Sequence, residues 1–235
     1  MDIAIRRSAE VIPLGIGYYT VPEASRLLRI APRNINRWLA GYKYEQHGKT
    51  SSMPPLWTPE LPGVEHHLEL SFRDLIELRF VNAFMDAGLG LKTIRVCLEY
   101  AKDCVSDPRP FSTRKFRTDG KTIFLESVER AGDAELLDLK KHQYVIKVVI
   151  EKTFKDLDIE DDAVARWRPY RGKKTIIIDP KRAFGQPIAN SSGVPTVALV
   201  DAMKAEGSIE RVAQLFVTAK SAVQDAINFE KSLAA

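Results

Sequence analysis

The sequence predicts a mainly α-helical protein of the α+β class. It would consist of an N-terminal helix-turn-helix, a small mixed β/α middle block and a C-terminal trihelical unit. Three observations predict this fold. Capped amphipathic segments recur along the chain, short β-branched stretches separate some of them, and the 235 residues have an ordinary globular composition, with 45% hydrophobic and 28% charged residues. Such a composition excludes collagen-like and wholly disordered chains.

The apolar runs and the cysteines of the sequence also predict the cellular compartment. No apolar run approaches the roughly 20 residues needed to cross a bilayer, and the first residues lack the apolar stretch of a secretory signal. The two cysteines, Cys97 and Cys104, are spaced for neither a disulfide framework nor a zinc site. We therefore expect a cytoplasmic protein with no membrane contact, no metal and no cofactor. The net charge of +4 is by itself compatible with an ordinary solvated surface.

The first motif is a pair of short helices near the N-terminus. Thr20 and Glu23 form a capping box at the start of the first helix, and Pro32 suits the first position of a second helix over Pro32–Leu39. About three residues separate the two, which is the geometry of a helix-turn-helix. The inward face of the second helix is predicted to hold Ile35, Trp38 and Leu39.

The outward face of the second helix carries side chains suited to duplex DNA, because arginine reads guanine or holds phosphate and asparagine pairs with adenine. The residues predicted to approach the major groove are Arg33, Asn34, Asn36 and Arg37. The predicted phosphate contacts are Arg26, Arg29 and Lys43, and the last member of the DNA-binding set is Thr20. The alternative is a basic helical hairpin that packs against the rest of its own domain.

The next stretch, Gly41–Gly63, is rich in proline and predicts irregular structure or a short β-ribbon, which could form a wing beside the second helix. Ser71 then caps a strongly amphipathic helix that ends at Gly88. A further helix over Lys92–Asp103 places Cys97 in the core.

The middle block gives weaker signals. Lys115–Glu126 predicts a β-hairpin, because its Asp119-Gly120 pair is typical of a two-residue turn. Gln143–Leu157 favours a helix over a strand, and Thr175–Ile178 predicts a short strand. The acidic run at 156–162 suits a solvated helix end better than a divalent-cation site, since it lacks the glycine and ligand alternation of a calcium loop.

Three helices are predicted near the C-terminus, over Val194–Glu206, Ile209–Phe216 and Ala219–Leu233. A unit of some 50 residues has a marginal core, so we expect it to lean on another surface or on a second copy of itself. A helical cap on the same chain and a dimer contact remain equally open. The exposed residues of the last helix that could make a second DNA contact are Lys220, Ser221, Gln224 and Asn228.

The N-terminal part resembles the winged helix-turn-helix of MerR-type regulators. The resemblance covers Tyr19–Leu39 and Leu70–Ala101, through the Tyr-Thr-x-x-Glu-Ala opening at Tyr19 and the Gly-Leu-Gly turn at Gly88. It implies DNA binding. No cysteine cluster resembles the metal-sensing loop of that family.

The C-terminal part, Arg182–Leu233, resembles a small domain of unknown function numbered 433, through its Phe184-Gly185-Gln186-Pro187 segment and the Gly193-Val194-Pro195-Thr196 turn. Proteins that combine both parts resemble VapB-like antitoxins, which are commonly encoded beside a PIN-type ribonuclease toxin. The predicted division is a MerR-like DNA-binding domain at 16–106, a middle α/β block at 107–180 and a trihelical domain at 181–235. The trihelical domain would serve dimerisation, toxin binding or a second DNA contact.

No catalytic arrangement stands out. The histidines lack metal-ligand spacing and no glycine-rich phosphate loop occurs, so we expect a non-enzyme. The first hypothesis is the homodimeric antitoxin of a type II toxin–antitoxin pair, which represses its own operon at double-stranded operator DNA and neutralises a PIN-type ribonuclease toxin. The second is a MerR-like transcriptional regulator that senses a small molecule in the middle block and has no toxin partner. A third is an interaction scaffold in which both helical units bind protein.

Overall fold

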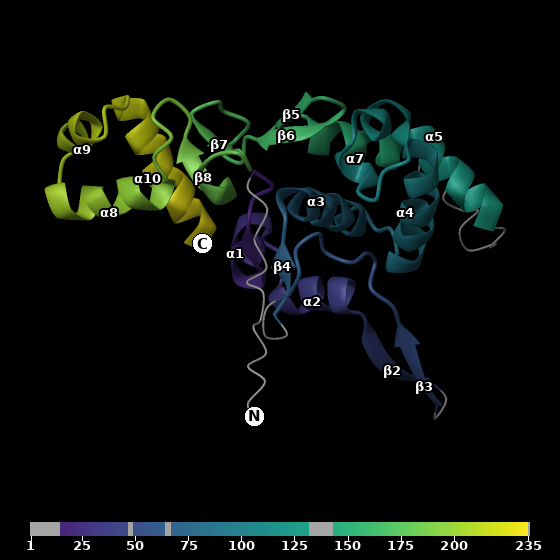
Figure 1. The fold of residues 1–235 in the computed structure, drawn as a ribbon. Helices are drawn as coiled ribbons and strands as arrows, with labels where there is room; N and C mark the ends of the chain where they lie inside the picture. Colours follow the sequence, from purple (N-terminus) through teal and green to yellow (C-terminus); the bar gives the residue numbers. More distant parts are fainter. Residues whose placement is uncertain (1–14, 47–48, 64–66, 132–142, 235) are drawn as a thin grey trace, which may run out of the picture.

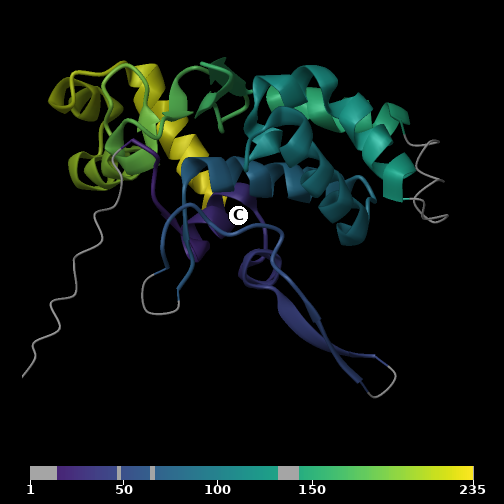
Figure 2. The same ribbon diagram turned by 45° about the vertical axis from the view of Figure 1, so that its right-hand side comes forward.

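The computed structural model describes residues 15–46, 49–63, 67–131 and 143–234. Its fold is mainly α-helical with small sheets, as the sequence predicts. Figures 1 and 2 show the C-terminal helices at one end, a small β-sheet next to them and a helical layer at the other end. Helices α1 and α2 and a long β-ribbon project below these parts.

The two short helices predicted near the N-terminus are present. Strand β1 (Tyr19–Thr20) leads into α1 (Val21–Leu28), and α2 spans Pro32–Ala40. The capping box forms as expected, since the backbone N–H of Thr20 donates to Glu23 Oε2 at 2.8 Å and the Thr20 hydroxyl accepts from the Glu23 backbone N–H. Arg29 ends α1 in the left-handed conformation with φ 58°, which turns the chain toward α2.

The region after α2 forms the ribbon. Strands β2 (Tyr42–Gln46) and β3 (Lys49–Met53) pair antiparallel, with Tyr42 opposite Met53 and Lys43 opposite Ser52. Strand β4 (Glu69–Leu70) then pairs with β1 and returns the chain to the helix-turn-helix. The ribbon extends away from the body in both views, as a wing does (Figures 1 and 2).

Helices α3 (Phe72–Asp86) and α4 (Leu91–Val105) follow, and the predicted Ser71 cap and the buried Cys97 are both confirmed. A 3-10 turn at Pro110–Ser112 joins them to α5 (Arg114–Ala131) and α7 (Gln143–Phe154). These elements share a cluster of phenylalanine rings in which Phe80 of α3 is central. The rings around it are Phe84, Phe111, Phe116 and Phe154, with centroids 4.9 to 6.4 Å from that of Phe80.

The hairpin predicted at Lys115–Glu126 is wrong, because this stretch lies inside α5. Gly120 makes no turn and is buried where α5 meets α7. A Cβ atom added there would lie 3.1 Å from both Phe116 Cε1 and Ile150 Cδ1. The glycine therefore allows two helices to approach closely, and Phe116, Ile123 and Phe124 face the core at helical spacing.

A four-stranded sheet follows α7, with the strand order β5-β6-β7-β8 and every neighbour antiparallel. Its strands are Leu157–Glu160, Ala163–Trp167, Ile176–Ile178 and Pro187–Ala189. The helix predicted over Gln143–Leu157 therefore ends at Phe154. The acidic run is not a helix end, since Asp161 and Asp162 form the β5–β6 turn with φ of 46° and 68°.

The three C-terminal helices are confirmed as α8 (Thr196–Glu206), α9 (Ile209–Leu215) and α10 (Lys220–Ala234). They pack on one another and on the sheet. The buried residues of α9 and α10 that form this core are Val212, Ala213, Ala222, Val223, Ala226 and Phe229.

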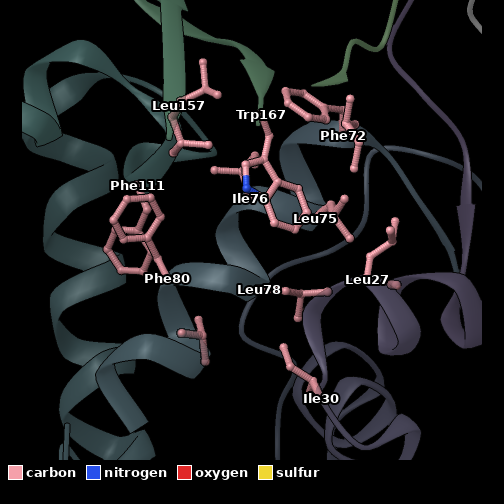
Figure 3. Packing of buried hydrophobic residues seen from close by; sticks show 14 of the residues in the cluster. Leu27, Ile30, Phe72, Leu75, Ile76, Leu78, Phe80, Phe111, Leu157 and Trp167 are labelled. Atoms are coloured by element: carbon pink, nitrogen blue, oxygen red, sulfur yellow. The ribbon is translucent and has the colours of Figure 1, made fainter. Parts of the chain in front are cut away.

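The three predicted domains are in contact throughout. Figure 3 shows buried side chains continuing from Leu27 of α1 through Leu75 and Phe80 of α3 to Phe111 and to Leu157 of β5. The Tyr19 hydroxyl donates to the Gly185 carbonyl at 2.7 Å, and a Cβ atom on Gly185 would lie 2.3 Å from the Tyr19 Oη. Gly185 also has a φ of +81°, so only glycine fits there. The division into domains stays a prediction.

Glu77 of α3 is a fully buried carboxyl. Its two oxygens accept the backbone N–H groups of Phe111 at 3.3 Å and Ser112 at 2.8 Å. Burial raises the pKa of Glu77 from 4.5 to about 8, against the opposing effect of those N–H donors and of Arg73 and Arg109.

This raised pKa predicts a pH dependence of stability. Because the folded pKa exceeds the unfolded one, the contribution of Glu77 is fully present below about pH 4.5 and is lost as the pH rises through about 8. We expect the free energy of unfolding to fall between pH 6 and pH 9 by a few kcal/mol in the native protein. In Glu77→Gln the fall should be smaller. Urea unfolding of both proteins at several pH values measures it, and parallel pH profiles would contradict it.

Candidate nucleic-acid interface

The outward face of α2 lies open to solvent. Arg33, Asn36 and Arg37 are exposed and Asn34 is half-buried. The opposite face is closed against the core as predicted, because Ile35, Trp38 and Leu39 are all buried. The side chains that suit a DNA groove are therefore available to a partner from outside the chain, while the apolar face packs on the rest of the domain, and the role of α2 in DNA binding stays a prediction.

A stacking contact joins α2 to the wing. The guanidinium carbon of Arg37 lies 3.8 Å from the centroid of the Tyr42 ring on β2, and Tyr44 follows with its ring centroid 5.9 Å from that of Tyr42. Lys43 lies between these tyrosines in sequence and is exposed. Arg33, Asn36 and Arg37 thus lie on α2, and Lys43 lies on the adjoining wing.

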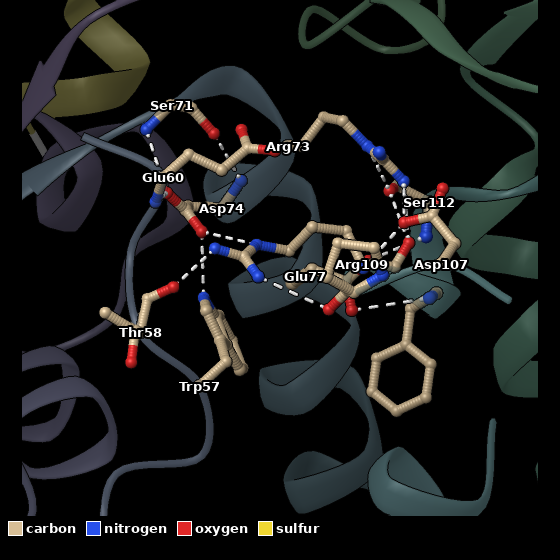
Figure 4. Close-up of polar contacts among 12 residues, drawn as sticks. Trp57, Thr58, Glu60, Ser71, Arg73, Asp74, Glu77, Asp107, Arg109 and Ser112 are labelled. Atoms are coloured by element: carbon tan, nitrogen blue, oxygen red, sulfur yellow. Dashed lines mark hydrogen bonds and ion pairs between the residues drawn. The ribbon is translucent and has the colours of Figure 1, made fainter. Parts of the chain in front are cut away.

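The loop after the wing is fastened by a buried carboxylate, Asp74 of α3. Its oxygens accept from Trp57 Nε1 at 2.8 Å, from Arg109 Nε at 2.7 Å, and from the backbone N–H groups of Glu60 and Ser71 at 3.0 and 3.1 Å (Figure 4). Both charged side chains are almost completely buried. This network fixes the path that returns from the wing to α3.

Sequence reasoning missed most of this network. Asp74 was recognisable only as the partner of Ser71 in a capping box, and Arg109 only as part of a Pro-rich break. The sequence signal for further donors to Asp74 is the capping box itself, because a capping carboxylate that faces a core needs more hydrogen-bond donors than the box supplies. Nothing local in the sequence indicates that Arg109 supplies one.

Two of the predicted phosphate contacts are engaged within the chain. Arg26 Nη1 lies 2.9 Å from Glu230 Oε2, and Arg29 Nη2 donates to the Ser232 carbonyl at 2.7 Å, so both meet α10. Thr20 is half-buried and its hydroxyl serves the α1 cap. These three residues therefore lie beside α2 with structural partners already in place, and their role in DNA binding stays a prediction.

The second predicted set lies along α10. Lys220 pairs with Glu210 at 2.9 Å, and Gln224 Nε2 donates to Asn228 Oδ1 at 3.2 Å. Ser221 is exposed on the same face. Lys220 and Ser221 stand at the start of this 15-residue helix and Asn228 lies about 12 Å further along its axis than Lys220, and the role of these residues in DNA binding stays a prediction.

The described residues show no arrangement for metal chemistry. Within them, no three or more His, Cys, Asp or Glu side chains gather closely enough to hold an ion. Burial raises the pKa of the Cys97 thiol, so this cysteine is an unreactive part of the core. No helix in the described ranges has the length and apolarity of a membrane span.

The chain is similar to a known protein over most of its length. No family model matches the chain. Over 221 residues the chain is 26% identical to the protein named "Putative antitoxin VapB45" from Mycobacterium tuberculosis (strain ATCC 25618 / H37Rv). The aligned region covers 89% of this chain and 92% of that protein. The chain is similar to a protein named as an antitoxin.

The fold is similar to a solved structure as well. The crystal structure of Rv2018 from Mycobacterium tuberculosis matches with a TM-score of 0.73 and 25% identity, over 92% of this chain and all of that one. Both similarities extend over nearly the whole chain and are not confined to the helix-turn-helix. They support an antitoxin-like family for this chain.

Proposed function

We propose that this protein is a DNA-binding antitoxin that represses its own operon and neutralises a ribonuclease toxin of the PIN type. The observation that carries the DNA-binding part is the solvent-facing side of α2, with Arg33, Asn36 and Arg37 exposed next to a β-ribbon wing. The antitoxin part is supported by the full-length similarity to a protein of that name. The protein acts here as a binding protein and not as an enzyme.

In the proposed complex α2 enters the major groove of double-stranded DNA, as the second helix of a helix-turn-helix does. Arg33, Asn34, Asn36 and Arg37 approach base edges, and Lys43 on the wing holds phosphate. A homodimer would place two such helices on half-sites about one helical turn apart, or a multiple of that distance. The size of an operator footprint checks this arrangement.

The Arg33→Ala/Arg37→Ala variant tests the DNA-binding part. We expect its affinity for a duplex from upstream of its own reading frame to fall on the order of 100-fold, because two direct DNA contacts are removed. Fluorescence anisotropy across a salt series measures it. The matched control is Lys204→Ala/Arg211→Ala, which removes two exposed cations on α8 and α9. Equal affinities for both double variants would contradict the proposal.

The toxin part needs a separate experiment. The protein encoded beside this one is to be purified with and without it, and its cleavage of RNA measured. We expect the ribonuclease to lose activity when this chain is present at equal concentration. A neighbour that lacks ribonuclease activity would exclude the antitoxin part while leaving DNA binding intact.

One observation favours a second candidate, a MerR-like regulator without a toxin partner. A cleft of about 790 Å³ lies in the middle block, with Ile150, Phe154 and Leu157 among its apolar residues and Arg117 and Lys174 among its cations. Such a cleft suits an anionic small molecule. A change in operator affinity caused by a small anionic metabolite, with no toxin partner, would favour this candidate.

A further inference from the structure

A second cleft, of about 710 Å³, lies where three separate parts of the chain meet. These parts are the end of α1, the loop between β6 and β7, and the end of α10. The residues that line the cleft are Arg29, Pro169, Tyr170, Arg171, Asn228, Lys231 and Ser232. Three of them are cationic and none carries a carboxylate, so the cleft has a positive potential that favours an anion.

Two of the three cations at this cleft, Arg171 and Lys231, remain available to a ligand. Arg171 and Lys231 are exposed, and within the described residues neither forms an ion pair; Arg171 has only the Tyr170 ring, 5.4 Å from its guanidinium carbon. The neighbouring carboxylates are already occupied. Glu230 pairs with Arg26, and Asp225 pairs with Lys173 at 2.9 Å. The cleft therefore holds two cations that have no ion-pair partner among the described residues.

The position of the cleft relates it to α2. Arg29 lies on its wall and is only three residues before Pro32, the first residue of α2. Figure 1 shows the end of α10, marked C, beside α1. The ion pair Arg26–Glu230 and the hydrogen bond from Arg29 to the Ser232 carbonyl join the two helices. Of these two contacts, the one nearer the C-terminal end of α1 is also the one nearer the C-terminal end of α10, so these two ends lie together.

We propose that this cleft binds the phosphate backbone of the DNA that flanks the sequence contacted by α2. Arg171 and Lys231 are its phosphate ligands, and Asn228 lines the same cleft. The proposal rests on the proposed function, because it takes α2 to be the helix in the major groove. In that docking mode the first helix crosses the DNA backbone, which places the Arg29 end of α1 next to phosphates.

The same geometry separates the residues that are predicted to make a second DNA contact into two groups. An α-helix rises 1.5 Å per residue, so Asn228 is about 5 Å from Lys231 along the axis of α10, whereas Lys220 is about 16 Å away. Lys220 is also paired with Glu210. The inferred phosphate site therefore includes Asn228 and excludes Lys220 and Ser221.

The test compares two double variants in binding to a random-sequence duplex of about 40 base pairs, because phosphate contacts do not depend on sequence. Arg171→Ala/Lys231→Ala should weaken binding on the order of 10-fold at low salt. The plot of log affinity against log salt has a negative slope, and the magnitude of this slope should decrease by about two, since two phosphate contacts are lost. The control Lys204→Ala/Arg211→Ala removes the same charge from α8 and α9 and should keep the native slope.

A second measurement shortens the DNA. On a duplex that covers only the half-site bound by α2, the native protein and Arg171→Ala/Lys231→Ala should bind equally, which a general loss of charge or of folding would not produce. If the variant keeps the native affinity and slope while Arg33→Ala/Arg37→Ala loses binding, the cleft is not a DNA site and the proposed function stands. If the native protein binds no duplex at low salt, both are wrong.

Discussion

Replacing Asp74 by alanine should lower the free energy of unfolding by about 3–5 kcal/mol, because it leaves a buried arginine without its counter-charge. Asp74 and Arg109 are almost fully buried, and the carboxylate also accepts from the Trp57 indole and from two backbone N–H groups (Figure 4). Alanine offers none of these donors an acceptor. Urea unfolding followed by tryptophan fluorescence measures the loss.

Two further variants make this result specific. Asp86→Ala removes an exposed carboxylate of the same helix, which accepts a hydrogen bond from the exposed end of Asn82, and should change stability by less than about 0.5 kcal/mol. The double variant Asp74→Ala/Arg109→Met removes both charges and should regain part of the lost stability. A loss below 1 kcal/mol in Asp74→Ala would show that water reaches this site and that the wing loop is not fastened by it.

Phe80→Ala should cost a similar 3–5 kcal/mol, since it opens a cavity at the centre of the phenylalanine cluster. The Phe80 ring contacts Phe111, Phe116 and Phe154, all of which lie beyond the predicted boundary at residue 107. The loss should therefore appear in a single transition that both tryptophan fluorescence and far-ultraviolet circular dichroism report at the same urea concentration. Two separate transitions would show that the parts before and after residue 107 unfold independently.

The matched control for this variant is Met85→Ala. Met85 lies on the same helix but is 37% exposed, so its truncation leaves no closed cavity and should cost well under 1.5 kcal/mol. Comparable losses from both variants would mean that the cluster is not tightly packed.

The sequence was most informative where structure is local. The caps at Thr20 and Ser71 and the proline at the start of α2 each depend on a few neighbouring residues, and all of them are present. The exposed and buried faces of α2 were also predicted, because a helical period separates them without any knowledge of the partners.

Two features that the sequence did not reveal depend on contacts between residues far apart in sequence. Asp119-Gly120 matches a two-residue turn, but Gly120 is needed where α5 meets Ile150 of α7, 30 residues later. Likewise Arg26 and Arg29 look like free basic residues until Glu230 and Ser232 are placed beside them. Tertiary packing overrides a local signal in both cases, and no pattern within a short window contains that information.

The close approach at Gly185 has a consequence for how such a protein can be rearranged. The helix-turn-helix is held to the distant C-terminal part by a hydroxyl that fits only over a residue without a side chain. Grafting residues 16–106 onto another protein would leave the Tyr19 hydroxyl without its acceptor, unless the recipient protein offers a glycine carbonyl at the same position. We expect natural recombination and laboratory chimaeras to succeed more often when the segment around Tyr19 and the segment around Gly185 are exchanged together.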